Sequence, residues 1–163
     1  MPALSIFVSG PCKIQVNTGA AYADLGYTDN DNLPQITYTD NIHEIKTVAS
    51  GAEPEELVLQ NSHAVISATL VKWDASVYAA LLARQRGAAY ATTVGRMLVN
   101  DSGTFGVKIL PTQSSKTYYA FARCYMIGDA VNQSQFGNVE QRLGLTFRAI
   151  PDQSNVLSTT GST

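Results

Sequence analysis

The chain has 163 residues, the length of a single domain that can bury a core of its own. Charged residues make up only 15% of it, against about 25% in average domains, and the formal net charge is −2. So little positive charge argues against a protein that reads nucleic acid, which needs a basic face. No apolar run is long enough to span a membrane, and no signal peptide is expected.

The first third of the chain has the alternation of a β-protein. Residues 13–18 alternate apolar and polar side chains, which predicts a half-buried strand, and Gly26 interrupts the pattern that follows. Residues 29–34 are rich in Asp and Asn and predict a turn. A long strand is predicted over residues 35–48, with a bulge near residues 40–41, where the apolar side chains change face.

An acidic loop punctuated by Gly and Pro follows at residues 49–56. Strand signals resume at residues 57–59 and again at residues 64–71, where the even-numbered apolar residues share one face.

One helix is clear in the sequence, at about residues 74–86. Asp74 is suited to accept hydrogen bonds from the free N–H groups of a first turn. Apolar residues follow at helical spacing, and Gly87 is typical of the residue that ends a helix.

Strands also dominate the last third. Residues 96–99 and 106–110 flank turn residues and predict a hairpin. Longer strands are predicted over residues 117–127 and 139–150, and the polar stretch between them is predicted to be a loop.

The order of these elements predicts one mainly β domain over residues 1–151. Its expected architecture is an antiparallel β-sandwich or half-open barrel flanked by one α-helix. Residues 152–163 are rich in Ser and Thr and are predicted to be a flexible tail.

Residues with catalytic or metal-binding chemistry follow no known spacing. Cys12 and Cys124 are far apart and are predicted to be free thiols in the core, which suits a reducing cytoplasm. His43 and His63 have no partners at ligand spacing, and the turn that begins at Asp29 lacks the Gly and Glu of a calcium loop. No nucleophile, nucleotide or zinc-protease motif is present. We therefore expect no enzyme activity, no metal and no cofactor.

Charge is divided unevenly along the chain. Residues 1–60 hold two lysines and eight acids, a net charge of −6, whereas residues 61–163 hold nine basic residues and five acids, a net charge of +4. A subunit that stacks head to tail needs two different, complementary faces, and opposite charge is one way to supply them.

Several segments, taken in order, resemble parts of phage tail tube proteins. In that family a short Leu-Gly segment leads to a strand, an acidic loop with Gly and Pro, and another strand before a helix. The corresponding segments of this chain are residues 25–28, 36–38, 44–48, 51–54 and 64–70, followed by Asp74. Residues 144–152 resemble the closing strand of the family, whereas residues 92–135 show no such correspondence.

The resemblance implies a β-sandwich with a flanking helix that forms homohexameric rings. The rings stack head to tail into the hollow tube of a virion tail, which is assembled in the host cytoplasm. Double-stranded genomic DNA passes through the lumen transiently and without sequence specificity during ejection. Other tail proteins are the implied partners: a sheath if the tail contracts, a tail terminator and a baseplate hub. No membrane is involved.

The resemblance makes the loop at residues 47–56 a candidate arm that reaches the adjacent ring, with a mobile surface loop as the alternative. The candidate contact residues are Thr47, Ser50, Gly51, Glu53, Pro54, Glu55 and Glu56. A weakly acidic lumen would repel DNA and let it slide, because a basic wall would bind phosphates tightly. The candidate lumen residues are Asp29, Asp31, Asp40 and Glu44, for which ordinary solvation is the alternative.

Two other functions stay open at this point. A tail terminator, neck ring or baseplate ring would share the contacts within a ring but would not stack on itself. A monomeric β-sandwich that binds a carbohydrate or small ligand would need an aromatic cleft. Tyr118, Tyr119 and Tyr125 are the candidates for such a cleft.

Overall fold

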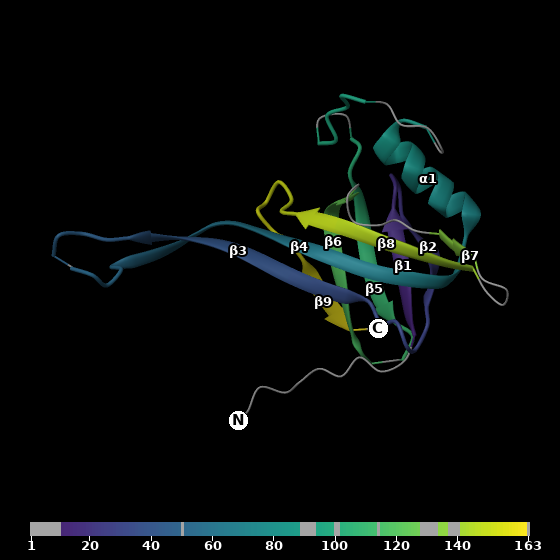
Figure 1. The fold of residues 1–163 in the computed structure, drawn as a ribbon, viewed down its shortest axis with the longest axis horizontal. Coiled ribbons are helices and arrows are strands. Elements are labelled where there is room, and N and C mark those ends of the chain that lie inside the picture. The colour runs from purple at the N-terminus through teal and green to yellow at the C-terminus, as the bar shows by residue number, and fades with distance from the viewer. Residues whose placement is uncertain are drawn as a thin grey trace.

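The computed structural model describes residues 11–49, 51–88, 94–99, 102–113, 115–127, 134–136 and 141–162. Over these residues the chain forms nine strands and one helix (Figure 1). In chain order they are β1 (Cys12–Asn17), β2 (Tyr22–Thr28), β3 (Gln35–Ile45), β4 (Glu56–Trp73), α1 (Ala75–Arg86), β5 (Phe105–Pro111), β6 (Thr117–Met126), β7 (Ser134–Phe136), β8 (Gln141–Ile150) and β9 (Thr159–Ser162). In this part of the chain, no helix has the length and apolar character needed to cross a membrane.

The strands form one antiparallel sheet that closes on itself. Pairing runs from β1 through β2, β4, β8, β6 and β5, and β5 pairs again with β1. A closed circuit of strands is a barrel. Three further strands extend its wall, with β3 on β4, β7 on β8 and β9 on β6. The predicted mainly β fold with a single helix is confirmed, and the closure of the circuit adds to it.

Alternate residues of each strand fill the inside of the barrel. On β4 the predicted core face is confirmed, because its members are all buried: Ala64, Ile66, Ala68 and Leu70. The rings of Phe105 and Phe147 meet edge to face at the centre, with centroids 5.7 Å apart. Cys12 and Cys124 lie in the same core as free thiols, as predicted.

The prediction missed β2, because Gly26 interrupts its alternation. In the structure Gly26 pairs with Ile14 on one side and with Trp73 on the other. A Cβ atom at this position would lie 2.3 Å from the carbonyl oxygen of Lys72. Glycine therefore allows the close approach of β2 and β4, and the residue that breaks the sequence pattern is the one that this packing requires.

A long hairpin of β3 and β4 projects from the barrel (Figure 1). β3 pairs with β4 along its whole length, but β8 pairs with β4 only from Ala64 to Leu70. The part of the hairpin before Ala64 therefore has no third strand beside it. At 3.4 Å per residue, residues 40–45 extend about 20 Å past that point.

One prediction for this hairpin needs correction and two are confirmed. The strands predicted at residues 57–59 and 64–71 are one continuous strand, β4, which begins at Glu56. The predicted acidic loop is present as the turn that joins β3 to β4. The predicted bulge is present, because the register shifts between Asn41 and Ile42. Its extra residue is Gln60 on β4, which has no partner on β3.

Helix α1 covers one end of the barrel. Arg84 donates hydrogen bonds of 2.6 Å to the carbonyl oxygens of Thr18 and Thr104, which lie beside the ends of β1 and β5. Gln85 accepts from the N–H of Met126 and donates to its carbonyl, at the end of β6. The helix therefore satisfies backbone groups that the rim of the barrel leaves unpaired.

The ends of α1 are set by local chemistry, as predicted. The Asp74 carboxylate accepts from the N–H groups of Ser76 at 2.8 Å and Val77 at 3.1 Å. Gly87 ends the helix in the left-handed region at φ +88°, with its N–H bonded to the carbonyl of Ala83.

We expect Asp74→Ala to lower the free energy of unfolding at neutral pH, because the first-turn N–H groups lose their acceptor. Hydrogen bonds from the Ser76 hydroxyl and from the N–H groups of Val77 and Ser76 hold the pKa of Asp74 below its ordinary value. Because the pKa of Asp74 is lower in the folded chain than in the unfolded chain, its carboxylate contributes to the free energy of unfolding, and this contribution is fully present above about pH 4. That contribution is lost as pH falls through the lower value. Urea unfolding of dilute wild type and variant should show a difference that shrinks below about pH 4, and a difference independent of pH would contradict this role.

The hairpin predicted after the helix is wrong. Residues 96–99 form turns and irregular structure, and the N–H of Gly103 donates to the carbonyl of Leu98 at 2.6 Å. Met97 and Val99 are exposed, so these apolar side chains do not take the core position that a strand requires. Residues 100–101 of the predicted turn lie outside the described residues.

Two short strands occupy segments that were predicted to lack them. β7 lies in the predicted polar loop and pairs with β8. β9 lies in the predicted flexible tail and pairs with β6 from Thr117 to Ala120, and Leu157 packs against the core. Threonine favours strands, and the free edge of β6 supplies a partner. The predicted boundary after residue 151 therefore cuts through the domain.

Candidate assembly surface

We define the arm as residues 40–62, the part of the β3–β4 hairpin that lies beyond β8. Residue 50 lies outside the described residues. An isolated two-stranded ribbon is at best marginally stable in water. The stability of the arm therefore depends on its attachment to the barrel and on any partner that covers it.

One side of the arm continues the core side of the barrel. Ile36 lies opposite Ile66 and packs on the core, and Ile42 projects from the same side of β3 because side chains alternate along a strand. Ile42 lies opposite Leu59, with Leu57 two residues further along β4. We call Ile42, Leu57 and Leu59 the apolar face. Their exposed fractions are 55%, 55% and 59%, although the strand pattern places them in line with the core.

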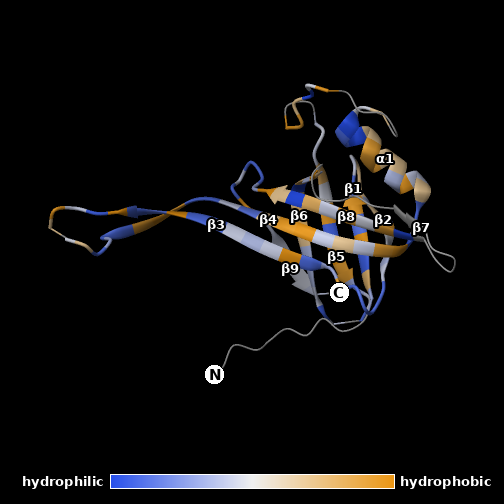
Figure 2. Ribbon diagram, in the orientation of Figure 1, coloured by the Kyte–Doolittle hydropathy of each residue, from blue (hydrophilic) through white to orange (hydrophobic). Residues whose placement is uncertain are grey.

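Exposure of the apolar face is unfavourable for an isolated chain. Full burial of a Leu or Ile side chain contributes roughly 1.5–3 kcal/mol, so covering the exposed half of each would contribute about 1 kcal/mol. Orange segments recur along the arm in Figure 2, far from the barrel core. Clustered aliphatic side chains on a projecting ribbon are typical of a surface that a partner covers.

The tip of the arm carries the predicted contact residues. Thr47, Gly51, Glu53, Pro54 and Glu55 all lie in the turn region and are exposed, whereas Glu56 is the first residue of β4 and Ser50 lies outside the described residues.

The turn has a defined structure. The Thr47 hydroxyl donates to the Glu55 carboxylate at 2.5 Å, and the Glu55 N–H donates to the carbonyl of Ile45 at 2.9 Å. Lys46 pairs with Glu44 at 3.1 Å. The predicted contact loop is therefore the folded end of the arm.

The four acids predicted to line a lumen form two separate groups. Asp29 pairs with Arg142 at 3.4 Å and accepts from the N–H of Asp31 at 2.6 Å, in the turn before β3. Asp40 and Glu44 lie on the arm, on the same side as the apolar face. The fold therefore does not bring the four carboxylates onto one surface.

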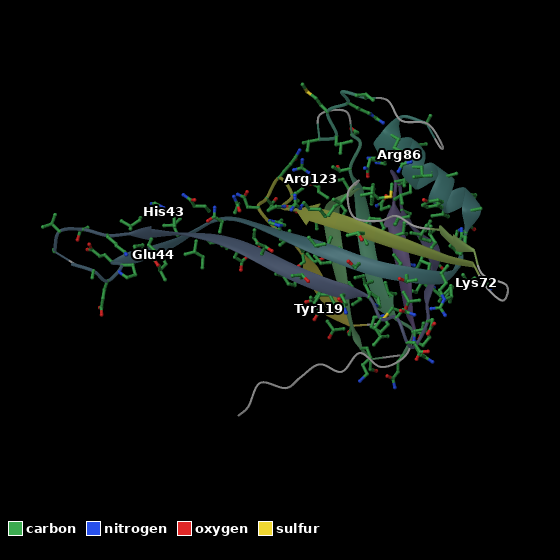
Figure 3. All side chains as sticks on the ribbon, in the orientation of Figure 1. His43, Glu44, Lys72, Arg86, Tyr119 and Arg123 are labelled. Atoms are coloured by element: carbon green, nitrogen blue, oxygen red, sulfur yellow. The ribbon has the colours of Figure 1, made fainter. Side chains whose placement is uncertain are left out.

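The arm concentrates negative charge. It contains five acids and one lysine, a net charge of −4, and the rest of the chain contains ten basic residues and eight acids, a net charge of +2. Figure 3 shows Glu44 on the arm and Lys72 on the opposite side of the molecule. The uneven charge seen along the sequence therefore corresponds to a separation in space.

Groups with potential reactivity are dispersed. Within the described ranges, no three His, Cys, Asp or Glu residues are close enough to hold a metal ion together. His43 lies on the arm, and Nε2 of His63 lies 3.4 Å from Nη2 of Arg148. Burial raises the pKa of both Cys12 and Cys124, which keeps the thiols protonated and weakly nucleophilic.

The three tyrosines proposed for a ligand cleft point to different surroundings. Tyr119 packs against the core. Tyr118 lies over Gly161, where a Cβ atom would come within 2.5 Å of the ring. Tyr125 lies opposite Arg148 on the outside of the barrel. The structure therefore does not assemble an aromatic cleft from these residues.

The apolar face was missed by sequence reasoning. The sequence predicts a strand at residues 57–59 but does not indicate that its leucines are exposed. Their exposure depends on where β8 stops pairing with β4, at Ala64. Such a distant pairing leaves no local signal in the arm.

Comparison of the sequence with protein-family models and with curated proteins finds no match.

Proposed function

We propose that this chain is the structural subunit of a phage tail tube. Six copies form a ring, and the rings stack head to tail around a lumen through which double-stranded DNA passes during ejection. The observation that carries the proposal is the arm, because its apolar face continues the core side of the barrel yet stays exposed in the single chain. The role is structural and involves no catalytic step.

The separation of the arm from the barrel core supports a role for the arm in assembly. The barrel circuit closes without the arm, and none of the described arm residues belongs to the core. The arm therefore contributes little to the stability of the single chain, whereas a second copy can cover its apolar face. A projecting part that docks on a different surface of the next copy gives a heterologous contact, which generates rings or filaments.

In this proposal Asp29 and Asp31 remain candidates for the lumen wall, because they lie on the barrel. Asp40 and Glu44 share a side with the apolar face and are assigned to the contact between copies. The tail terminator, the baseplate hub and, in a contractile tail, the sheath are the proposed further partners. The place of assembly is the host cytoplasm and the final location is the virion tail.

The arm is also consistent with a second candidate function. In this alternative the chain forms a single ring of the virion, such as a terminator, neck or baseplate ring. In such a ring the arm would bind a neighbour within the ring. The two candidates differ in whether rings stack, which microscopy resolves directly.

The test is negative-stain microscopy of the purified chain over a range of concentrations. It is paired with a variant in which residues 42–60 are replaced by an Asn-Gly turn. Asn41 and Asn61 are directly opposite in the hairpin, so a two-residue turn can join them. We expect hollow tubes or stacked rings from wild type, and a folded variant by circular dichroism that does not stack. Isolated rings would favour the second candidate, and a monomer at every concentration would contradict both.

A further inference from the structure

A second surface, on the outside of the barrel, has the opposite character to the arm. It combines three lysines and three tyrosines from neighbouring strands, and we call it the Lys–Tyr face. Its members are Lys13, Tyr22, Tyr27, Lys72, Lys108 and Tyr118.

The strand register brings these residues together. Lys13 of β1 lies opposite Tyr27 of β2, and Tyr27 lies opposite Lys72 of β4, so the three form a row across the wall. Lys108 of β5 lies opposite Gln15, two residues along β1 from Lys13. Diagonal neighbours of this kind are about 7–8 Å apart, close enough for one ligand segment to contact both.

The tyrosine rings are held in place by the lysines and by glycines. The Lys108 ammonium lies 4.0 Å from the ring centroid of Tyr118 and 5.8 Å from that of Tyr22. A Cβ atom on Gly106 would lie 2.9 Å from the Tyr22 hydroxyl, so the absence of a side chain at Gly106 leaves space for this ring. The result is a set of ordered rings interleaved with ammonium groups.

Part of the positive charge of this face is offset, because Asp24 and Asp74 line the same pocket as Tyr27 and Lys72. Asp24 pairs with Lys13 at 3.0 Å and accepts from Gln15 at 2.6 Å. Lys72 is exposed, and the close contacts of Lys108 are the two rings. The face therefore offers positive charge and flat apolar rings at the same place.

We infer that the Lys–Tyr face of one copy receives the arm of the next copy. The inference rests on the proposed assembly and names the surface that the arm contacts. The arm has a net charge of −4, which is complementary to the positive charge of the lysines. It also exposes Ile42, Leu57 and Leu59, whose apolar side chains can pack against the tyrosine rings.

The two surfaces lie at opposite ends of one strand. β4 begins at Glu56 on the arm, and Lys72 is its second-last residue, on the Lys–Tyr face. Figure 3 shows Lys72 on the side of the molecule away from the arm. Because arm and face point in different directions, each copy can give its arm to one neighbour and receive the arm of another. The contact therefore repeats along one direction.

The test uses two charge-reversed variants. The first carries Glu44→Lys, Glu53→Lys and Glu56→Lys, which changes the net charge of its arm from −4 to +2, so that its arm and its face are both positive. The second carries Lys72→Glu and Lys108→Glu, so that its arm and its face are both negative. Each alone should repel itself and raise the critical concentration for assembly roughly tenfold or more, given the usual strength of surface charge pairs. A one-to-one mixture should assemble near the wild-type concentration, because each arm then meets a face of opposite charge.

The control is Arg86→Glu with Arg123→Glu, which reverses as much charge as the second variant does, on the barrel away from the Lys–Tyr face, on α1 and beside Ile150 on β8. It should assemble like wild type, and circular dichroism confirms that every variant is folded. If each reversed variant assembles alone like wild type, or if the mixture fails to assemble, the Lys–Tyr face is not the receiving surface. Either result leaves the tube proposal intact as long as wild type forms tubes. A wild type that stays monomeric overturns both proposals.

Discussion

The double substitution Ile42→Asn and Leu59→Asn is expected to abolish stacking while leaving the barrel folded. Both side chains are more than half exposed in the single chain, so their loss costs the isolated barrel little. In the assembly each loses about 1 kcal/mol of burial, and each new amide that is buried without a partner costs about 1–3 kcal/mol more. A loss of about 4 kcal/mol per arm corresponds to nearly a thousandfold in the binding constant.

The matched control for this experiment lies on the opposite side of the same ribbon. Ile45 and Val58 are each 41% exposed and belong to the other side of the arm. Ile45→Asn with Val58→Asn should therefore leave assembly much closer to wild type. Sedimentation velocity measures the assembled fraction, and microscopy identifies the particles. Equal losses from the two pairs would contradict the assignment of the contact to the apolar face.

The second large effect is expected inside the barrel, from Phe147→Ala. Phe147 is fully buried on β8, the strand that joins β4 to β6 in the circuit, and its ring meets that of Phe105. Truncation of a buried phenylalanine to alanine typically costs about 3–5 kcal/mol, a large part of the roughly 5–15 kcal/mol that stabilises a domain. Urea unfolding should be measured in the variant that lacks residues 42–60, so that assembly does not add to the apparent stability.

Phe147→Leu provides the comparison, because it keeps most of the volume and should cost less than about 2 kcal/mol. The ratio of the two losses reports how tightly the barrel centre is packed. A loss below about 1 kcal/mol for the alanine variant would show that the core rearranges around the missing ring, contrary to the close packing seen in the structure.

The elements that sequence reasoning identified are those whose signals are local. Asp74 and Gly87 set the ends of α1 through contacts within one or two turns, so the helix could be placed from the sequence alone. The core strands β5, β6 and β8 carry their own alternation. β2 does not, because Gly26 is required by the close approach of the backbone of β4, which is distant in the chain. β9 likewise depends on the open edge of β6, which only the folded sheet reveals.

The candidate site divides in the same way. The tip of the arm has a composition that marks it as an exposed turn, and the residues predicted there do lie at the end of the hairpin. The apolar face depends on the point where β8 leaves β4, and the Lys–Tyr face depends on registers among five strands. Surfaces built from distant pairings of this kind could not be predicted from one sequence.

The extra residue at Gln60 changes the phase of the side-chain pattern along β4. Inside the barrel the even-numbered residues of this strand point inward, but beyond Gln60 the odd-numbered Leu57 and Leu59 project from that side. Had the pairing stayed regular, both leucines would point away from Ile42. Deleting Gln60 should preserve their orientation, because Leu59 then lies opposite Ile42 in a regular pairing. A single unpaired residue thus decides which side of the ribbon a neighbouring copy meets.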